Sequence, residues 1–293
     1  MTPDARAATI GVDVGGTKIS VGVVEPDGSH KLVGTLPTVR GQGESNAETV
    51  RRLVASAAVM LDNPSAPVGI SVTTTVNQHG RLRDASNWLG WSGWSARDIL
   101  GPTSQGSATV ANDALCGAVA EQRRAALSGT FLYITLGTGI AHTAVIDGRP
   151  LPGAHGGALF TAWTPAGYDS NAEPLPTWEN LASGPALAHR FDGGSDARPL
   201  VTAARAGDAR ALAVLEEGAR WFGAYLATIV QTYDPSLVVV GGGLGHGVPE
   251  YVTAATTRMR SLVGQEFFQQ IPVETATLGA ESGWVGAGLL AAE

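Results

Sequence analysis

The sequence predicts an α/β protein with two domains, and three observations support this fold class. The chain has 293 residues, of which 44% are hydrophobic, and a chain of this length more often forms two domains than one. A pattern of strand, glycine turn and strand returns 122 residues later, so that Gly15 falls on Gly137. Short apolar runs typical of buried strands are followed by stretches with helical periodicity. The repetition indicates two halves built from one supersecondary unit.

In the first half, residues 8–39 alternate between apolar and polar side chains and predict a β-meander. A turn is expected at residues 25–28, because its Pro and Gly suit the required backbone angles. A helix and two strands follow, at residues 46–61, 67–73 and 107–110. The last strand leads to Asp113, at the start of an Ala-rich helix that runs to about Ala126.

In the second half, residues 131–146 repeat the hairpin pattern around the turn Gly137-Thr-Gly139. A Pro- and Gly-rich stretch at 149–176 predicts an irregular and functional loop, since long loops inside compact domains usually have a function. Helices follow, among them one with an apolar stripe from Leu215 to Val230. The remaining elements are a buried strand at 237–240, a helix from about Pro249 and a closely packed helix at 282–292.

Composition excludes several classes of protein. The net charge of −7 and the pI of about 5.4 do not favour a nucleic-acid partner, which would require surplus Lys and Arg. The N-terminus has no signal-peptide core, and no apolar run approaches the roughly 20 residues of a membrane helix. We therefore expect a cytoplasmic protein with no membrane partner. Cys116 is the only cysteine, so it cannot form an intrachain disulfide, and we expect it to pack in a helix.

Glycine turns at three strand ends are the main functional signal. The first is Asp13-Val-Gly-Gly-Thr17-Lys18, the second is Leu136-Gly-Thr-Gly139 and the third ends the run from Asp234 to Gly243. Each turn alone is weak evidence, because glycines also make tight turns for purely structural reasons. A tight backbone lined with N–H groups suits a chain of phosphates, and Asp13 adds a ligand for magnesium. The combination predicts phosphoryl transfer.

In these turns and in several further motifs, the chain resembles the ROK sugar kinases, which belong to the hexokinase and actin-like ATPase superfamily. The likeness runs nearly end to end. Its matching residues are Asp13 to Lys18, Asn87 with Gly90-Trp91, Asn112-Asp113, Leu136 to Gly139, Glu179 with Ala182-Ser-Gly184, and Asp234 to Gly243. The resemblance implies a two-domain actin-like ATPase (ribonuclease H-like) fold with an interdomain cleft. It places the domains at 1–113 plus 279–293 and at 114–278, and it makes a homodimer the expected assembly.

The same resemblance implies ATP and Mg²⁺ and assigns roles to individual residues. Phosphate contacts are expected from Gly15, Gly16, Thr17, Lys18, Thr138 and Gly139, and adenosine contacts from Gly241, Gly242 and Gly243. Asp13 would position the metal or the phosphates, with a turn-capping Asp as the alternative. Asp113 matches the catalytic base that accepts the proton of the substrate hydroxyl, and the alternative is a helix N-cap.

Three polar residues match family positions that orient the sugar, namely Asn87, Asn112 and Glu179. A turn-forming Asn is the alternative for Asn87, and a solvated Glu at a helix start is the alternative for Glu179. His155 is a lone loop histidine, and we expect it to be structural. None of the six histidines belongs to a His-Glu-x-x-His signature.

The chain departs from the family after its second glycine turn. ROK kinases continue as Gly-Glu-x-Gly-His, whose Glu and His bind the sugar, whereas this chain has Leu159-Phe160-Thr161-Ala162-Trp163. Each missing polar partner typically changes binding by about 1 kcal/mol or more, so glucose should fit poorly. We expect Phe160 and Trp163 to stack on a ring face or to accept a deoxygenated, amino-substituted or bulkier acceptor. Alternatively, they only pack the loop of a protein that no longer binds sugar.

The family's cysteine-rich zinc motif is also missing, because residues 164–178 contain no cysteine, and no structural zinc is expected. The sequence thus predicts a kinase that phosphorylates a primary hydroxyl of a modified hexose or cyclitol, in preference to glucose. The alternative is a non-catalytic sugar- or nucleotide-binding sensor, although we expect no room before Asp13 for the DNA-binding domain of ROK repressors. Polyphosphate or another nucleotide stays open as the phosphate donor.

Overall fold

The computed structural model describes residues 7–83, 88–157 and 160–293, which form two compact units. The first unit comprises Met1–Leu127, Pro152–Ala158 and Ala280–Glu293, and the second comprises Ser128–Leu151 and Leu159–Gly279. These units differ from the predicted domains chiefly at residues 114–127, which pack in the first unit. The predicted domain boundaries therefore stay a prediction.

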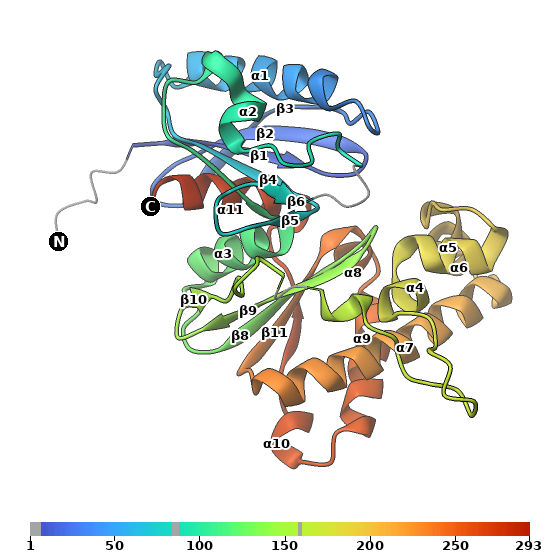
Figure 1. Cartoon of the computed structure of the whole chain (residues 1–293). Coiled ribbons are helices and arrows are strands. Elements are labelled where there is room, and N and C mark those ends of the chain that lie inside the picture. The colour runs from blue at the N-terminus through green and yellow to red at the C-terminus, as the bar shows by residue number, and fades with distance from the viewer. Residues whose placement is uncertain (1–6, 84–87, 158–159) are drawn as a thin grey trace. The chain divides into compact units, whose positions relative to one another are not determined.

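A five-stranded sheet forms the centre of the first unit (Figure 1). Its strand order is β3-β2-β1-β4-β7, where β1 pairs antiparallel with β2 and parallel with β4, and β4 pairs parallel with β7. The strands are β1 (Thr9–Val14), β2 (Lys18–Val24), β3 (His30–Pro37), β4 (Val68–Val72) and β7 (Ala108–Asn112). The predicted meander and both later strands are confirmed. Because β1, β4 and β7 are parallel, their carboxyl ends meet at one edge of the sheet.

Helices cover both faces of this sheet (Figure 1). α1 (Gly43–Met60) lies on one face, while α3 (Asp113–Ala125) and α11 (Ser282–Ala291) lie on the other. α11 approaches α3 so closely that a Cβ on Gly286 would lie 1.8 Å from the carbonyl oxygen of Cys116. The expected close packing of the last helix and the burial of Cys116 are therefore confirmed. Short elements complete the unit, namely β5 (Thr75–Val76), β6 (Leu82–Arg83), α2 (Ala96–Leu100) and η1 (Gly101–Thr103).

The second unit repeats the sheet of the first. Its strand order is β10-β9-β8-β11-β12, with the same sequence of antiparallel and parallel pairs. The strands are β8 (Phe131–Leu136), β9 (Ile140–Ile146), β10 (Arg149–Pro150), β11 (Leu237–Gly241) and β12 (Val273–Thr275). The offset of 122 residues carries the bounds of β1 and β2 onto those of β8 and β9. The predicted internal repeat is thus confirmed.

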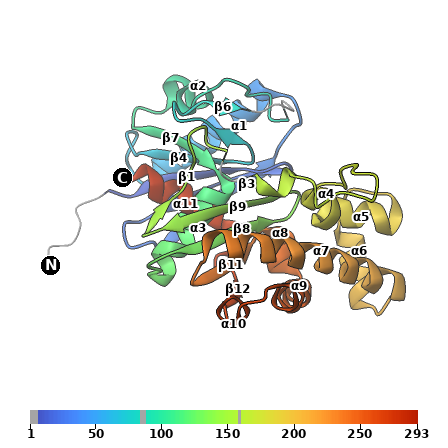
Figure 2. The same ribbon diagram turned by 60° about the horizontal axis from the view of Figure 1, so that its bottom comes forward.

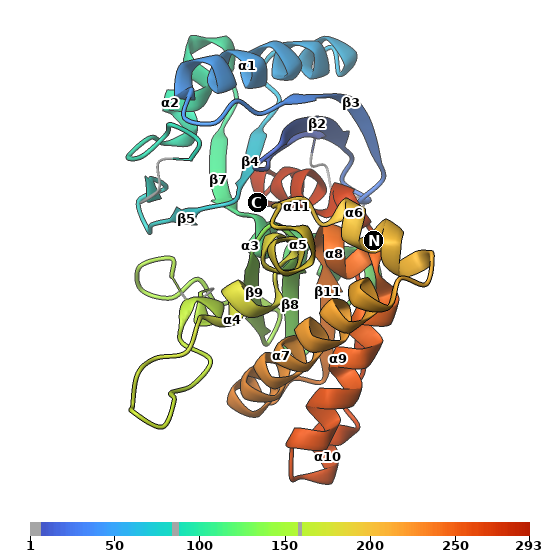
Figure 3. The same ribbon diagram turned by 90° about the vertical axis from the view of Figure 1, so that its right-hand side faces the viewer.

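Two long helices, α7 (Ala209–Tyr233) and α9 (Pro249–Leu262), cover the second sheet and supply much of its core (Figures 2 and 3). The other helical elements of this unit are α4 (Trp178–Ala182), α5 (Gly184–Asp192), α6 (Arg198–Arg205), α8 (Gly242–Gly247), α10 (Glu266–Gln269) and η2 (Thr161–Trp163), with η3 (Gly279–Glu281) leading out of it. Within the described residues, no helix is both long and apolar enough to cross a bilayer.

Two helices differ from the prediction, one in its start and one in its existence. α1 begins at Gly43, three residues before the expected start, because its first turn is anchored where Trp91 Nε1 donates to the carbonyl oxygen of Gly43. α8 follows β11 directly, whereas the sequence predicted the next helix only near Pro249. Glycine-rich residues have low helix propensity, so α8 forms through its packing on β8 and β11 and has no sequence signal.

Candidate active site

Two carboxylates lie at the carboxyl edge of the first sheet. Asp13 is near the end of β1, and Asp113 follows β7 as the first residue of α3. The strand between them, β4, contributes Ser71, which pairs in register with Asp13 and whose Oγ donates to Asp13 Oδ1 at 2.7 Å. The parallel register therefore brings together three polar side chains that are far apart in the sequence.

The surroundings of this pair change the acidity of both groups. Burial, and secondly the negative charge of Asp13, raise the pKa of Asp113 to about 7. Burial also raises the pKa of Asp13, although the hydrogen bond from Ser71 and the charge of Lys18 oppose this shift. Both residues are half-buried. A carboxylate that titrates near neutrality on a half-buried residue is suited to act as a general base.

Asn112, and not Asp113, is the N-cap of α3. Its Oδ1 accepts from the backbone N–H of Ala114 at 2.8 Å, and its Nδ2 donates to the carbonyl oxygen of Thr74 at 3.1 Å. Asp113 Oδ1 also accepts from the N–H of Ala114 at 2.8 Å. The capping alternative for Asp113 is therefore wrong, because the preceding residue fills that position. Asn112 holds the start of α3 and thereby orients Asp113, and a sugar contact of Asn112 stays a prediction.

Asp13 also lies against the first turn of α11. A Cβ on Gly283 would come within 2.5 Å of Asp13 Oδ1, so residue 283 has to be glycine for the carboxylate to keep this position. Helix N-termini stabilise negative charge through their free N–H groups and the helix dipole. No local pattern predicts this contact, since Gly283 and Asp13 are 270 residues apart.

The first glycine turn leaves its tip exposed. The N–H of Gly15 donates to the carbonyl oxygen of Lys18 at 3.0 Å, which closes the hairpin, while Thr38 Oγ1 donates to the carbonyl oxygen of Gly15 at 2.9 Å. Thr17 and Lys18 are exposed, and a Cβ on Gly16 would lie 3.5 Å from Nε1 of Trp88. The turn is thus fixed by its neighbours and presents an exposed lysine, as a phosphate site requires.

The second glycine turn has a different partner. The N–H of Gly137 donates to the carbonyl oxygen of Gly139 at 3.0 Å, and Thr138 at the tip is exposed. A Cβ on Gly139 would lie 2.7 Å from Glu179 Oε2, and that oxygen accepts from the N–H of Ile140 at 2.9 Å. The glycine therefore makes room for a carboxylate of the same unit, in addition to the phosphate contact predicted for it.

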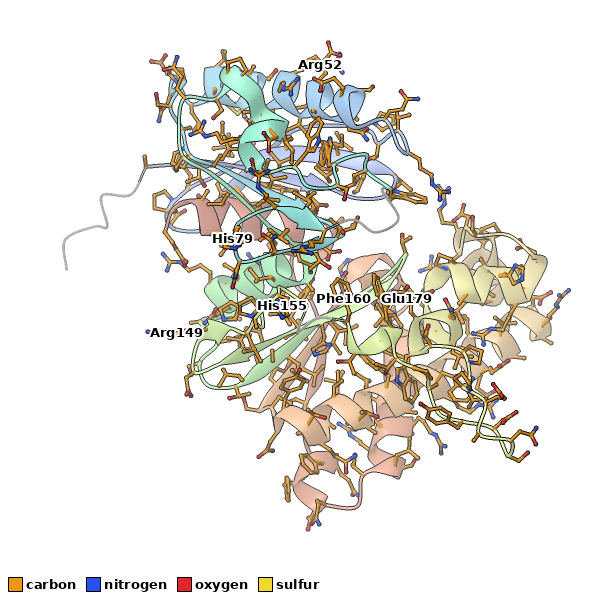
Figure 4. All side chains as sticks on the ribbon, in the orientation of Figure 1. Arg52, His79, Arg149, His155, Phe160 and Glu179 are labelled. Atoms are coloured by element: carbon orange, nitrogen blue, oxygen red, sulfur yellow. The ribbon has the colours of Figure 1, made fainter. Side chains whose placement is uncertain are left out.

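Glu179 also holds the divergent loop. Trp163, the last residue of η2, donates from Nε1 to Glu179 Oε2 at 3.2 Å, and its ring lies 4.4 Å from the ring of Phe160. Figure 4 shows Phe160 and Glu179 on neighbouring elements of the second unit. The sequence predicted all three residues as acceptor ligands, and the structure brings them into one cluster. Asn87 and Leu159 lie outside the described residues.

The third glycine run serves packing at two of its three positions. A Cβ on Gly241 would meet the hydroxyl oxygen of Tyr133 at 2.2 Å, and one on Gly242 would meet the carbonyl oxygen of Leu136 at 2.5 Å. Gly243, by contrast, is exposed and has open space where a side chain would be. Gly243 is thus the most accessible of the three, and the adenosine contacts of Gly241, Gly242 and Gly243 stay a prediction.

A cavity of about 180 Å³ lies in the first unit between the β5–β6 hairpin and residues 154–155. His79 and His155, both labelled in Figure 4, lie on its wall. Its lining consists of Asn77, Gln78, His79, Arg83, Ala154 and His155. None of these residues is among the predicted site residues. Ser71 was also missed, although a lone serine inside the apolar strand Val68–Val72 is a signal that could have found it.

Two matching sheets and paired carboxylates at strand ends define a protein of the actin-like ATPase fold, as predicted. The chain belongs to the ROK family, whose model matches residues 9–293. Over 97% of this chain and 99% of the other, the structure is similar to a ROK family glucokinase from Streptomyces griseus in complex with glucose and AMPPNP, with a TM-score of 0.84 and 29% identity.

Two sugar kinases are similar to this chain in sequence. The chain is 29% identical to a kanosamine kinase of Amycolatopsis mediterranei (strain S699), over 96% of this chain and 95% of the relative. It is 30% identical to a glucokinase of Streptomyces coelicolor (strain ATCC BAA-471 / A3(2) / M145), over 97% and 98%. The predicted enzyme class, a carbohydrate kinase, is confirmed by these relatives.

Proposed function

We propose that this carbohydrate kinase transfers the γ-phosphoryl group of ATP to a primary hydroxyl of its acceptor, with Asp113 as the general base. The observation that carries the proposal is the raised pKa of Asp113, about 7, at the strand edge that it shares with Asp13. The Asp113 carboxylate takes the proton of the hydroxyl, the freed oxygen forms a bond to the γ-phosphorus, and the bond to the leaving ADP breaks.

The donor set at the strand edge fits Mg²⁺. Asp13 is the group that would hold the ion, because magnesium in nucleotide sites is usually bound by one or two carboxylates together with the substrate phosphates. Two mutually repelling carboxylates with raised pKa values gain most from a nearby cation. When bound, Mg²⁺ spreads the charge of the phosphates. The exposed Lys18 and the turns at Gly15–Gly16 and Thr138–Gly139 contribute phosphate contacts, and Gly243 lies near the adenosine.

For the acceptor, a modified hexose or a cyclitol is favoured over glucose. The apolar pair Phe160 and Trp163 supports this preference, because neither ring can pair with hydroxyls in the way of the family's Glu and His. Asn87, Asn112 and Glu179 orient the acceptor in this proposal. A homodimer is the proposed assembly, and the expected cytoplasmic location stays a prediction.

The test is a phosphotransfer screen over hexoses, amino sugars and cyclitols, with ATP, other nucleotides and polyphosphate as donors. Asp113→Asn should lower kcat by about 100-fold or more, since general bases typically contribute that much. Asp62→Asn is the matched control, because Asp62 is exposed and its positive φ is one that Asn tolerates well. An Asp113→Asn enzyme as fast as the wild type would overturn the assignment of the base.

A further inference from the structure

The cluster of Glu179, Trp163 and Phe160 has an unusual distribution of polar atoms. Glu179 Oε2 accepts two hydrogen bonds, one from the backbone N–H of Ile140 and one from Trp163 Nε1. The indole N–H is the single polar group of the two aromatic side chains, and it points to the carboxylate. The cluster therefore keeps no side-chain donor for a hydroxyl oxygen of a ligand.

The groups that remain are a negative charge and two aromatic rings. Glu179 Oε1 has no hydrogen bond to the described residues, and no described Lys, Arg or His forms a salt bridge with this carboxylate. Trp163 has 56% of its surface exposed, and its ring lies 4.4 Å from that of Phe160 at an angle of 35°. Both rings are thus beside an acidic group and near the protein surface.

This combination selects for a cation. The face of an aromatic ring attracts positive charge, most strongly in Trp, and a carboxylate forms its strongest hydrogen bonds with charged donors. A neutral hydroxyl can also donate to Glu179 Oε1, but it gains little from a ring face and brings no positive charge to balance the carboxylate. An ammonium group, in contrast, donates to Glu179 Oε1 while its charge is stabilised by the rings.

We propose that the acceptor carries an ammonium group, which Glu179 Oε1 binds beside the rings of Trp163 and Phe160. This inference depends on the proposed function, because it names the chemical class of the acceptor as an amino sugar or an aminocyclitol. The ammonium group does not react. It fixes the orientation of the ring, and the phosphoryl group goes to the primary hydroxyl at another carbon.

The first experiment compares acceptors with and without a positive charge. Kinetics with ATP are measured for glucose, for hexoses with an amino group at carbon 2, 3 or 4, and for the N-acetylated form of each. At least one amino hexose should have a kcat/KM at least tenfold above that of glucose and of its own N-acetylated form. Since acetylation removes the charge and adds bulk, this comparison separates charge recognition from a merely larger pocket.

The second experiment changes the cluster. Glu179→Gln keeps the shape and removes the charge, and it should reduce the preference for the amino hexose over glucose by at least tenfold. Phe160→Leu keeps an apolar side chain and removes a ring face, so the same preference should fall roughly two- to fivefold. Glu216→Gln is the control for loss of one charge in the same unit, because Glu216 is exposed and forms a surface salt bridge with Arg220 one helical turn away.

The outcomes separate this inference from the proposed function. If glucose or the N-acetylated sugars are phosphorylated as efficiently as every amino hexose, the ammonium site is refuted and the kinase assignment stands. The same holds if Glu179→Gln lowers kcat/KM for glucose and amino hexose by equal factors. If no acceptor of any kind is phosphorylated, the proposed function fails first and this inference falls with it.

Discussion

The missing side chain of Gly139 makes room for the carboxylate of Glu179. A Cβ on residue 139 would lie 2.7 Å from Glu179 Oε2, whereas ordinary contacts begin at about 3.4 Å. The second glycine turn therefore has two roles. It is predicted to contact phosphate, and it sets the position of Glu179, which is predicted to orient the acceptor. The two roles can be tested apart, because they affect different kinetic constants.

Gly139→Ala should push Glu179 away from the N–H of Ile140 and so weaken acceptor binding. We expect the KM for the acceptor to rise roughly tenfold, since a hydrogen bond to a charged group is lost. Unfolding free energy should fall by only about 1 kcal/mol, because the hydrogen bond from Ile140 is lost while the end of the flexible Glu179 side chain can move away from the new Cβ. Gly264→Ala is the control, as Gly264 has open space and no positive φ. A changed KM for ATP with an unaltered KM for the acceptor would contradict this role.

The acidity of Asp113 should depend on Asp13. Burial and the charge of Asp13 raise the pKa of Asp113 to about 7, so activity should increase with pH through that value as the base loses its proton. In Asp13→Asn the repelling charge is gone, and the pKa of Asp113 should fall towards its usual range without reaching it. The measurement is an NMR titration of the Asp113 carboxyl carbon in the nucleotide-free protein. An unchanged pKa would show that burial alone causes the shift.

The same shift predicts that Asp113→Asn stabilises the protein at high pH. A raised pKa means that the folded state binds the proton more tightly than the unfolded state, so the stability of the wild type falls as pH rises from about 4 to about 7. Above pH 7 the variant should be more stable by roughly 1–3 kcal/mol. This range is smaller than the free energy that corresponds to the full pKa shift, because Asp113 is partly exposed. Urea unfolding at pH 4 and pH 8 measures it, and the advantage should vanish at pH 4.

Because His142 is buried, we expect it to make stability depend on pH with the sign opposite to that of Asp113. It is buried in β9, where its Nδ1 lies 2.9 Å from the hydroxyl of Tyr225 and its Nε2 lies 3.3 Å from that of Tyr233. Burial lowers the pKa of His142 to about 4, so this residue stays neutral in the folded state while the unfolded state takes up a proton below about pH 6.5.

The contribution of His142 to stability is therefore fully present above about pH 6.5 and is lost as pH falls towards 4, by up to about 3 kcal/mol. His142→Asn should flatten the decrease between pH 7 and pH 5, while the surface variant His79→Asn should leave it unchanged. Chemical denaturation at several pH values gives the slopes. Equal slopes for wild type and His142→Asn would contradict the prediction.

Much of the fold could be predicted because its signals are local. The repeat at a spacing of 122 residues was visible in glycines and apolar runs, and it predicted both hairpins. A separate apolar run at residues 107–110 predicted the strand that leads to Asp113. The contact of Ser71 with Asp13 depends on the register of β1 and β4, which no local pattern specifies. The hydrogen bond from the N–H of Ile140 to Glu179 Oε2 joins residues on either side of the irregular stretch at 149–176. The backbone geometry of that stretch follows from tertiary packing and not from periodicity.

Phe160 and Trp163 lie in the loop in which the chain departs from its family. If Phe160 and Trp163 cause the loss of glucose recognition, the double change Phe160→Glu with Trp163→His should restore two polar partners. We expect kcat/KM for glucose to rise by tenfold or more, because each restored partner is worth about 1 kcal/mol. The two single changes should give less than half of this effect each, since residues in contact are energetically coupled. Tyr168→His, in an exposed part of the same stretch, is the control for introducing a histidine. Efficiency for glucose that stays at the wild-type value in a folded double variant would show that this pair does not determine the choice of acceptor.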